Sequence, residues 1–442
     1  MLGLKNNNYG QGRTHAKRNG RGGKPSFHRR LQSLTSPLIL PLALTLPLLA
    51  GLTGCGGEKY TVKVYKPDKV WDSYTLPSGA LGGNTSVIDM EGNLVTRYNC
   101  AGFPAKLLPD SSILCHNLEV GWLVVPKLRQ VSQDGQILWE FKSWYKNSAK
   151  QHHDFQFSGG NPVGYYVPGE NMDMIGPASG GNMLVLGFYP VKQSEQNIRR
   201  GLMDDSVLYE IDPAGNVLWE WHAREHIDEM GFSPSALKDL RVELLLKDWL
   251  HVNTASYIGP NKWYSEFDDQ RFHPDNIIIA SPRARWVVIV DKVTGKIVWR
   301  LGPDYSPGSP SAGVVGGLNF SHGAHIVPQG LPGAGNLLVY DNGTASGYGD
   351  QTSHSRDYSR ALEIDPITQT VVWEYRTPYS PNMGSLQRLP NGNTFITEGL
   401  SGRMIEVTPE KEVVWEARGF PLYRAYRVPK EWVKPAQTAL TP

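Results

Sequence analysis

Ile211-Asp212-Pro213-Ala214-Gly215-Asn216-Val217-Leu218-Trp219-Glu220 is one copy of the pattern that decides the fold. A hydrophobic residue and a polar residue, often Asp, precede a turn with Gly or Pro, and two apolar residues then lead to a Trp that Glu usually follows. Further copies lie at residues 131–140, 290–299, 364–374 and 407–416, and a copy without Trp lies at 87–95. Each copy predicts two antiparallel strands joined by a tight turn, because strand-forming apolar residues flank turn-forming ones.

A second pattern, a Gly-Asn turn followed by an apolar strand, precedes several copies, as at Gly181-Asn182, Gly335-Asn336 and Gly392-Asn393. Two hairpins form a four-stranded sheet, and six such sheets around an axis form a β-propeller. A plain β-sandwich is the alternative, but sandwiches do not repeat a Trp hairpin. We therefore predict an all-β chain whose six-bladed propeller spans residues 81–420, between an N-terminal tether at 55–80 and a C-terminal tail at 421–442. The Trp-to-Trp spacings of 80, 80, 74 and 42 residues predict long insertions, which we expect on one face, where binding residues usually lie.

The N-terminal segment has the features of an export signal. Residues 1–30 contain eight Lys and Arg and no acid, and residues 31–57 carry no charge. Leu52-Thr53-Gly54-Cys55 matches the bacterial lipobox, a small-residue cleavage site directly before a cysteine. A transmembrane helix is the alternative, but three prolines at positions 37, 41 and 47 would interrupt it. We predict a signal peptide at 1–54 and a lipid on Cys55 that anchors the protein to a membrane of the cell envelope, facing the periplasm or the exterior.

Composition narrows the function classes. The leader contains eight of the 44 Lys and Arg and none of the 42 Asp and Glu, so the remaining chain has a net formal charge of −6. This balance argues against a nucleic-acid-binding protein, which would carry a basic surface. Besides Cys55 there are only Cys100 and Cys115. In an oxidising compartment these two could form a disulfide, and the alternative is two unpaired buried thiols.

Five histidines lie in three segments that each follow a different Trp hairpin. These are His152 and His153, His251, and His322 and His325. Because the segments occupy similar stages of successive blades, closure of the propeller should direct them to one central channel. The alternative is that each histidine caps a turn or satisfies a backbone carbonyl.

Here the residues carry a resemblance to a known family. Across residues 80–420 the chain resembles the bacterial arylsulfate sulfotransferases, which move a sulfuryl group between phenols without a nucleotide donor. The matching segments, in order, are His152-His153-Asp154, Asp248-Trp249-Leu250-His251-Val252-Asn253, Ser281-Pro282-Arg283, Ser321-His322-Gly323-Ala324, Leu338–Gly343, Tyr358-Ser359-Arg360 and Gly384–Thr394.

The resemblance implies a six-bladed propeller with its site at the channel mouth and a ping-pong reaction through a sulfohistidine. By position the nucleophile falls on His322, with His251, Asn253 and Arg283 around the sulfuryl group. His153 joins them in preference to His152, since strand alternation lets only one of two neighbours face the channel. Further positions that the motifs leave open are His152, His325 as a rival nucleophile, and Arg360.

The residue types suit this chemistry. A neutral imidazole can attack sulfur and form a covalent intermediate, Arg283 can bond two oxygens in a fork, and Asn253 can donate to a third oxygen. His251 or His153 can protonate the leaving phenolate and later deprotonate the acceptor phenol. We expect an aryl sulfate donor and a phenolic acceptor, with no metal or other cofactor. Where the family commonly has Gln-His-Asp, this chain has Ser321-His322-Gly323, so an acid that could orient the nucleophile is missing.

Two other functions remain as alternatives. The repeat at 290–299 resembles the Trp-docking repeat of quinone-dependent dehydrogenases, but those enzymes usually have eight repeats and calcium-binding carboxylates, and we count six copies. A non-catalytic envelope propeller that binds a partner protein would show an apolar upper face without convergent His and Arg.

Overall fold

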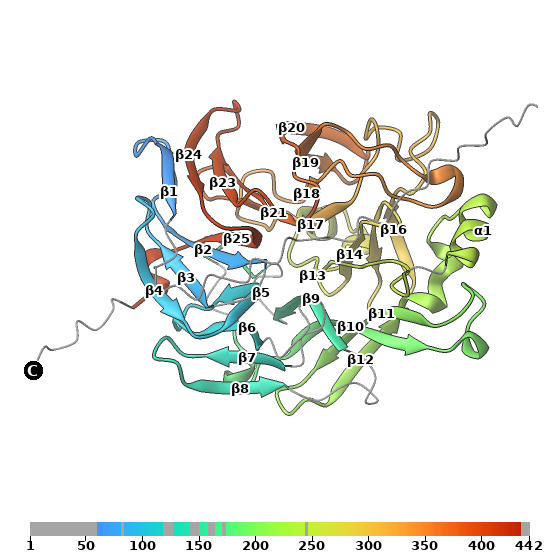
Figure 1. Cartoon of the computed structure of the whole chain (residues 1–442), viewed down its shortest axis with the longest axis horizontal. Helices are drawn as coiled ribbons and strands as arrows, with labels where there is room; N and C mark the ends of the chain where they lie inside the picture. The colour runs from blue at the N-terminus through green and yellow to red at the C-terminus, as the bar shows by residue number, and fades with distance from the viewer. Residues whose placement is uncertain are drawn as a thin grey trace, which may run out of the picture. The chain divides into compact units, whose positions relative to one another are not determined.

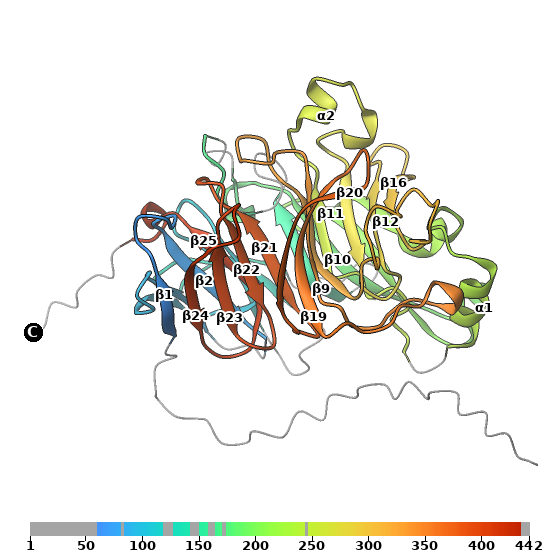
Figure 2. The same ribbon diagram turned by 90° about the horizontal axis from the view of Figure 1, so that it is seen from above.

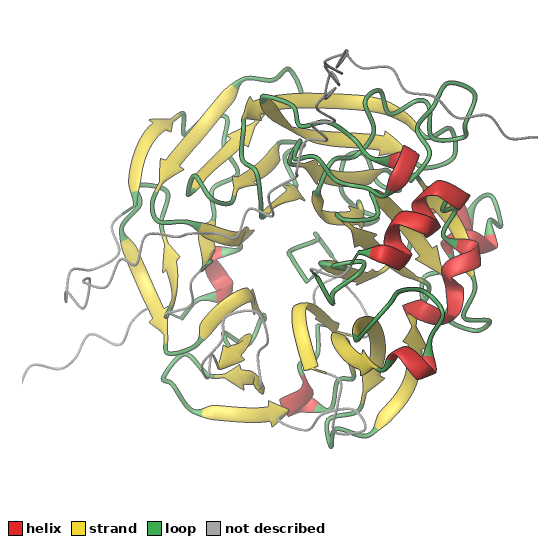
Figure 3. Ribbon diagram, turned by 45° about the vertical axis from the view of Figure 1, so that its right-hand side comes forward, coloured by secondary structure: helices red, strands yellow, loops and turns green. Residues whose placement is uncertain are grey.

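The computed structural model describes residues 60–80, 84–117, 127–141, 150–157, 164–169, 174–243 and 246–434. They form six sheets, five of four strands and one of five, that follow one another around an axis (Figure 1). The innermost strands contact one another in the cyclic order β25, β5, β9, β13, β17, β21 and back to β25. The protein is therefore an all-β, six-bladed propeller with four-stranded blades, as predicted, and Figure 3 shows its ring of sheets. The predicted signal peptide and Cys55 lie outside the described residues.

The strands of each blade are given from the axis outward. Blade 1 contains β25 (Leu422–Val428), β2 (Tyr74–Gly79), β3 (Thr85–Ile88) and β4 (Leu94–Tyr98). Blade 2 contains β5 (Ala101–Leu107), β6 (Ile113–Asn117), β7 (Lys127–Val131) and β8 (Ile137–Phe141). Blade 3 contains β9 (Lys150–Phe157), β10 (Met183–Val191), β11 (Met203–Ile211) and β12 (Val217–His222).

Blade 4 contains β13 (Thr254–Tyr257), β14 (Ile277–Ser281), β15 (Trp286–Val290) and β16 (Ile297–Leu301). Blade 5 contains β17 (Ser321–Ile326), β18 (Leu337–Asp341), β19 (Tyr358–Asp365) and β20 (Thr370–Pro378). Blade 6 contains β21 (Gly384–Arg388), β22 (Thr394–Glu398), β23 (Arg403–Val407) and β24 (Val413–Arg418), and β1 (Thr61–Tyr65) pairs with β24. The described helical segments are η2 (Pro177–Ser179), η3 (Gln193–Glu195), η4 (Ala223–Glu229), α1 (Pro234–Val242), α2 (Lys262–Ser265), η5 (Gln270–Phe272), η6 (Gly349–Gln351) and η7 (Lys430–Trp432).

The first and the last described strands complete the ring, so the propeller is larger than the predicted range of 81–420. β25 pairs with β2 along its whole length, from Tyr74 opposite Val428 to Gly79 opposite Leu422. The predicted C-terminal tail therefore contains the innermost strand of blade 1, and the predicted tether at 55–80 contains β1 and β2. Pairing between segments more than 300 residues apart leaves no local signal in either segment, which is why the sequence pattern missed it.

The repeated tryptophans connect neighbouring blades. The indole nitrogen of each donates to a backbone carbonyl in the turn of the corresponding hairpin of the next blade: Trp139 to Pro213 (2.7 Å), Trp219 to Lys292 (2.9 Å), Trp299 to Pro366 (2.8 Å), Trp373 to Pro409 (2.9 Å) and Trp415 to Met90 (2.8 Å). The last bond joins blade 6 to blade 1. The single N–H donor of each indole is therefore used between blades. Each of these tryptophans links its own blade to the next one in the ring.

Insertions lie on both faces of the propeller. The strands of a blade are antiparallel, so the connections between blades emerge on the face where the innermost strands begin, called the upper face below. α1 lies in such a connection, between β12 and β13, whereas α2 lies between the first two strands of blade 4 and therefore on the opposite face. Figure 2 shows α2 beyond one end of the strands and α1 toward the other. The prediction that the insertions gather on one face is wrong.

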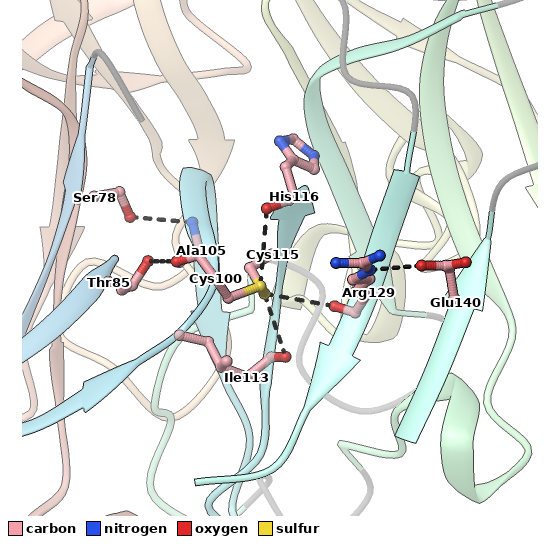
Figure 4. The surroundings of a disulfide bond; sticks show 9 residues. All are labelled: Ser78, Thr85, Cys100, Ala105, Ile113, Cys115, His116, Arg129 and Glu140. Atoms are coloured by element: carbon pink, nitrogen blue, oxygen red, sulfur yellow. Dashed lines mark hydrogen bonds and ion pairs between the residues drawn. A yellow bond between two sulfur atoms is a disulfide. The ribbon is translucent and has the colours of Figure 1, made fainter. Parts of the chain in front are cut away.

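A disulfide joins Cys100 and Cys115, with a Cα–Cα distance of 5.9 Å (Figure 4). Both cysteines are buried in the hydrophobic core that blades 1, 2 and 3 share. Cys100 immediately precedes β5, and Cys115 lies on its neighbour β6, so the bond fixes the start of the innermost strand of blade 2.

Candidate functional site

Three of the predicted histidines meet at the upper face. His153 is the fourth of the eight residues of β9, His251 lies three residues before β13, and His322 is the second residue of β17. These are the innermost strands of three successive blades. His153 (φ 56°), His251 (φ 52°) and Phe320 (φ 59°) all have left-handed backbone conformations. Non-glycine residues rarely adopt this conformation, and backbone strain of this kind is found most often at functional sites.

The rings form a continuous row. The His153 and His251 ring centroids are 4.7 Å apart with planes at 78°. The Phe320 ring is 6.4 Å from His251 and 5.8 Å from His322. Phe320 is partly exposed, whereas His153 and His322 are buried. The closure of the propeller thus assembles these residues from segments that are about 70 to 100 positions apart in the sequence.

The hydrogen bonds of His322 select one tautomer. Asn342 Nδ2 donates to the backbone carbonyls of Ser380 (2.7 Å) and Met383 (2.8 Å), so the other end of the amide, Oδ1, faces His322 Nδ1 at 2.7 Å. The Phe320 carbonyl oxygen also lies 3.2 Å from Nδ1. Both oxygens are acceptors, so Nδ1 must carry the hydrogen, and Nε2 keeps its lone pair. Asn342 therefore orients His322, which is the role that an acid next to the nucleophile was expected to have.

Burial keeps His322 and His153 neutral. It lowers the pKa of His322 to about 3, although the hydrogen bond to Asn342 acts in the opposite direction. Burial, together with the neighbouring His251 and His152, also holds the pKa of His153 well below its usual value. A neutral His322 with a free Nε2 lone pair has the form that a nucleophile needs.

Asp248 orients His251. Its Oδ2 is 2.5 Å from His251 Nδ1, and its Oδ1 accepts the His251 backbone N–H at 2.9 Å. Although burial opposes it, the interaction with His251 lowers the pKa of Asp248. Asp248 belongs to the motif at residues 248–253, but the motif gave no indication of this role. Because Nδ1 of His251 bonds the carboxylate, Nε2 lies on the side of the ring that faces away from Asp248.

Arg283 lies beside this pair. Its Nη1 donates to the Asp248 carbonyl at 2.8 Å, and its Nη2 donates to Glu243 Oε2 at 3.2 Å. The guanidinium also lies over the Tyr348 ring, 5.8 Å from its centroid. In this arrangement the fork holds the Asp248 segment, and an incoming anion would have to replace Glu243.

Asn253 supports the nucleophile segment. Its Nδ2 donates to the Ser321 carbonyl at 3.0 Å, one residue before His322, and its Oδ1 accepts from Thr254 Oγ1 at 3.0 Å. The side chain is fully buried. Asn253 therefore holds β17 in place, and only its second amide hydrogen is available to a ligand.

His152 and His153 do not alternate as the strand argument assumed. β9 bulges at this point, because Gln151 pairs with Gly187 and Phe155 with Val185, so three residues of β9 oppose one of β10. His152 stacks on Phe188, with ring centroids 3.6 Å apart, and its Nδ1 lies 2.6 Å from Nδ1 of His153. His153, which the sequence favoured over His152, is the one that contacts His251. The bulge in β9, and not strand alternation, places it there.

His325 and Arg360 have other partners. His325 Nδ1 donates to the Gly323 carbonyl at 2.9 Å and its Nε2 lies 2.9 Å from Tyr165 Oη. It lines a small cavity of about 20 Å³ on the propeller axis, together with Asp154, Gln156, Tyr165, Thr254, Ser256, Gly323, Ala324, Ser385, Leu386, Arg424 and Tyr426. Arg360 is buried and bonds Asp341 (2.9 Å), Glu374 (3.4 Å) and two backbone carbonyls. Within the described part of the chain, no contact joins Arg360 to the histidine row.

The described residues show neither a metal site nor a membrane-spanning helix. No group of three His, Cys, Asp or Glu side chains in these ranges is arranged to hold a metal ion. No helix among them combines the length and the apolar character that crossing a bilayer requires.

Comparison with solved structures gives distant similarities. A protein of unknown function from Bacteroides caccae aligns at 12% identity and a TM-score of 0.41, over 81% of this chain and 99% of that one. Quinohemoprotein alcohol dehydrogenase from Comamonas testosteroni aligns at 12% identity and a TM-score of 0.40, over 83% and 68%. Virginiamycin B lyase from Staphylococcus aureus aligns at 9% identity and a TM-score of 0.35, over 82% and 89%. These values carry no information on activity.

Comparison with sequences is more specific. No curated protein sequence matches the chain. The profile of the arylsulfotransferase (ASST) family matches residues 130–418, which is well over half of the chain and includes the whole histidine row. The chain belongs to the arylsulfotransferase family.

Proposed function

We propose that the protein transfers a sulfuryl group from an aryl sulfate to a phenol through a sulfohistidine at Nε2 of His322, without a nucleotide donor. The observation that carries this proposal is the tautomer of His322. Asn342, itself oriented by two backbone carbonyls, leaves the Nε2 lone pair free beside His251 and Phe320. Membership of the arylsulfotransferase family supports the reaction class.

In the first half-reaction, the Nε2 lone pair forms a bond to sulfur while the bond between sulfur and the aryl oxygen breaks. The leaving phenolate takes a proton from His251, whose charged form Asp248 stabilises. The intermediate is an imidazolium that carries SO₃⁻ on Nε2 and the original hydrogen on Nδ1. The positive charge that develops on the ring strengthens the bonds from Nδ1 to the oxygens of Asn342 and Phe320, because hydrogen bonds from charged donors are the stronger ones.

In the second half-reaction, an acceptor phenol gives its proton to His251 and attacks the sulfur, and the bond between sulfur and Nε2 breaks. The enzyme then returns to its starting protonation state. The partly exposed Phe320 ring lies between His251 and His322 and offers an apolar wall to the aryl group of either substrate. Arg283 binds the sulfuryl oxygens when these replace the carboxylate of Glu243.

The experiment incubates the protein with 4-nitrophenyl sulfate and phenol and follows nitrophenol release, with mass spectrometry of the peptide that contains His322. The expected result is turnover, and a mass increase of one SO₃ group on His322 when phenol is omitted. His322→Asn should abolish both. His273→Asn, which changes a histidine in the β13–β14 connection on the opposite face, is the matched control. Equal activity of His322→Asn and the parent would overturn the proposal.

We further propose that the protein is an exported lipoprotein cleaved before Cys55 and held at the cell envelope by a lipid on that residue. The support is the basic segment, the uncharged stretch and the lipobox at 52–55. Expression in a bacterium with labelled palmitate should label the parent and not Cys55→Ala. Labelling of both proteins, or of neither, would contradict this assignment.

A further inference from the structure

The closing strand β25 reaches into the site from the far end of the sequence. It lies between β21 and β5 in the ring of innermost strands. Tyr423 Oη donates to the backbone carbonyl of His153 at 3.0 Å. Arg424 Nη2 donates to the backbone carbonyl of Asn253 at 2.8 Å. Both side chains are buried, so water does not compete for either hydrogen bond.

Arg424 also bonds a buried carboxylate that connects several blades. Asp154 Oδ2 accepts from Arg424 Nη1 (3.0 Å) and from the Ala255 backbone N–H (3.2 Å), and its Oδ1 accepts from Lys106 Nζ (3.0 Å) and the Phe155 backbone N–H (3.0 Å). The four donors use the full accepting capacity of a carboxylate. Although burial opposes ionisation, Arg424 and Lys106 lower the pKa of Asp154.

The geometry points to a function for Arg424 that Lys106 does not share. Through one nitrogen, the guanidinium holds Asp154, the neighbour of His153. Through the other nitrogen it holds the carbonyl of Asn253, whose side chain bonds the Ser321 carbonyl directly before His322. Lys106 bonds Asp154 and the Phe155 carbonyl, and no described contact joins it to Asn253.

We propose that Arg424 is a positioning residue for sulfuryl transfer, which spans Asp154 and the Asn253 carbonyl and thereby sets the place of His322 relative to His153. The inference rests on the proposed function. It implies that the transfer site is complete only after the C-terminal strand has closed the ring. Arginine is suited to this place because its planar fork bonds two acceptors at once, which a lysine ammonium on a flexible stem does not reproduce.

Three variants test the proposal. Arg424→Met removes the fork, Arg424→Lys keeps the charge without the fork, and Lys106→Met removes one cation from the same carboxylate without touching Asn253. In each case Asp154 keeps at least one cationic partner, so the buried carboxylate is not left unpaired. We expect kcat to fall at least tenfold in Arg424→Met and in Arg424→Lys, with KM changed less than threefold. Lys106→Met should keep kcat within threefold of the parent.

A measurement without substrate separates this proposal from the proposed function. The imidazole ¹⁵N shifts of His322 report its tautomer directly. We expect the parental His322 shifts in Lys106→Met and displaced His322 shifts in both Arg424 variants, because the Asn253 contact to the Ser321 carbonyl next to His322 loses its support. This pattern in a protein without sulfuryl transfer would refute the proposed function and retain the positioning role.

Other outcomes overturn the positioning role. A parental kcat in Arg424→Lys, or an equal loss in Lys106→Met and Arg424→Met, would mean that net charge and not the fork is responsible. If Arg424→Met does not fold, Tyr423→Phe replaces it, because this change deletes only the hydroxyl, which lies 3.0 Å from the His153 carbonyl and 3.4 Å from the Asn253 carbonyl. We expect kcat to fall three- to tenfold with an unchanged thermal midpoint, and a parental kcat in this variant would refute the role of β25.

Discussion

Replacement of Asn342 tests the link between the tautomer of His322 and its reactivity. Asn342→Leu removes the acceptor that lies 2.7 Å from Nδ1 and leaves only the Phe320 carbonyl at 3.2 Å. The leucine side chain has a similar volume, so the change creates no large cavity. The expected result is a lower kcat at every pH, because a fraction of the molecules then carry the hydrogen on Nε2 and the transition state loses a charge-assisted bond.

The size of the effect follows from two hydrogen-bond strengths. A bond between neutral groups contributes about 1 kcal/mol and a bond to a charged group about 1.5–3 kcal/mol. His322 is neutral in the ground state and gains positive charge during attack, so the loss specific to the transition state is about 0.5–2 kcal/mol. Each 1.36 kcal/mol is about tenfold in rate, so kcat should fall about 2- to 30-fold. The Met383 carbonyl also loses its donor, whereas the Ser380 carbonyl keeps a bond from Ser359 Oγ at 3.3 Å. The loss at Met383 should lower the unfolding free energy by about 1–3 kcal/mol.

Asn342→Asp is the matched variant. Like Asn342→Leu it lacks the Nδ2 donor to the Ser380 and Met383 carbonyls, but it keeps an acceptor for Nδ1–H and places a carboxylate beside the ring. A neighbouring negative charge raises the pKa of His322 above its parental value of about 3. Activity at pH 8 should therefore be closer to that of the parent than in Asn342→Leu, and it should decline at a higher pH on acidification. Nitrophenol release between pH 4 and 9, with the urea midpoint as a control for folding, measures both effects. A folded Asn342→Leu protein with parental kcat would refute the reasoning.

Three further predictions concern stability. Acidification from pH 7 to pH 5 should destabilise the fold, because burial lowers the pKa of His116 to about 3 and of His325 to about 4. Unfolded histidines bind protons below about pH 6.5, so in this window the unfolding free energy should fall by up to about 1.4 kcal/mol per pH unit for each such histidine; equal urea midpoints at pH 7 and pH 5 would contradict this. Reduction of the Cys100–Cys115 disulfide, whose cysteines are 15 positions apart, should lower the unfolding free energy by about 3 kcal/mol on the chain-entropy estimate, and calorimetry with and without reductant measures it. Trp299→Phe should cost about 1–3 kcal/mol because a buried Pro366 carbonyl loses its donor, and Trp373→Phe should cost less because Trp373 is more exposed; equal losses in chemical denaturation would argue against the blade-to-blade bonds.

The candidate site could be predicted in part. Sequence motifs named His153, His251 and His322, and the structure brings these rings together. The same motifs gave no role to Asn342 or Asp248, whose partners become visible only when strand ends meet at the upper face. Arg360 shows the converse, because an arginine that matches a motif is occupied by Asp341 and Glu374 within its own blade. Lys106 and Arg424 left no signal, since neither lies in a motif that sequence reasoning singled out.

The sequence by itself determined the repeating hairpins, their number and the all-β class. Strand alternation, turn residues and the Trp of each copy are local features that act over about ten residues, so they can be read without knowledge of the fold. Only the tertiary structure decided how the ring closes, because β25 and β2 are separated by almost the whole chain. It also decided which nitrogen of His322 is free, since the bulges, left-handed residues and buried ion pairs that orient the site depend on contacts between blades.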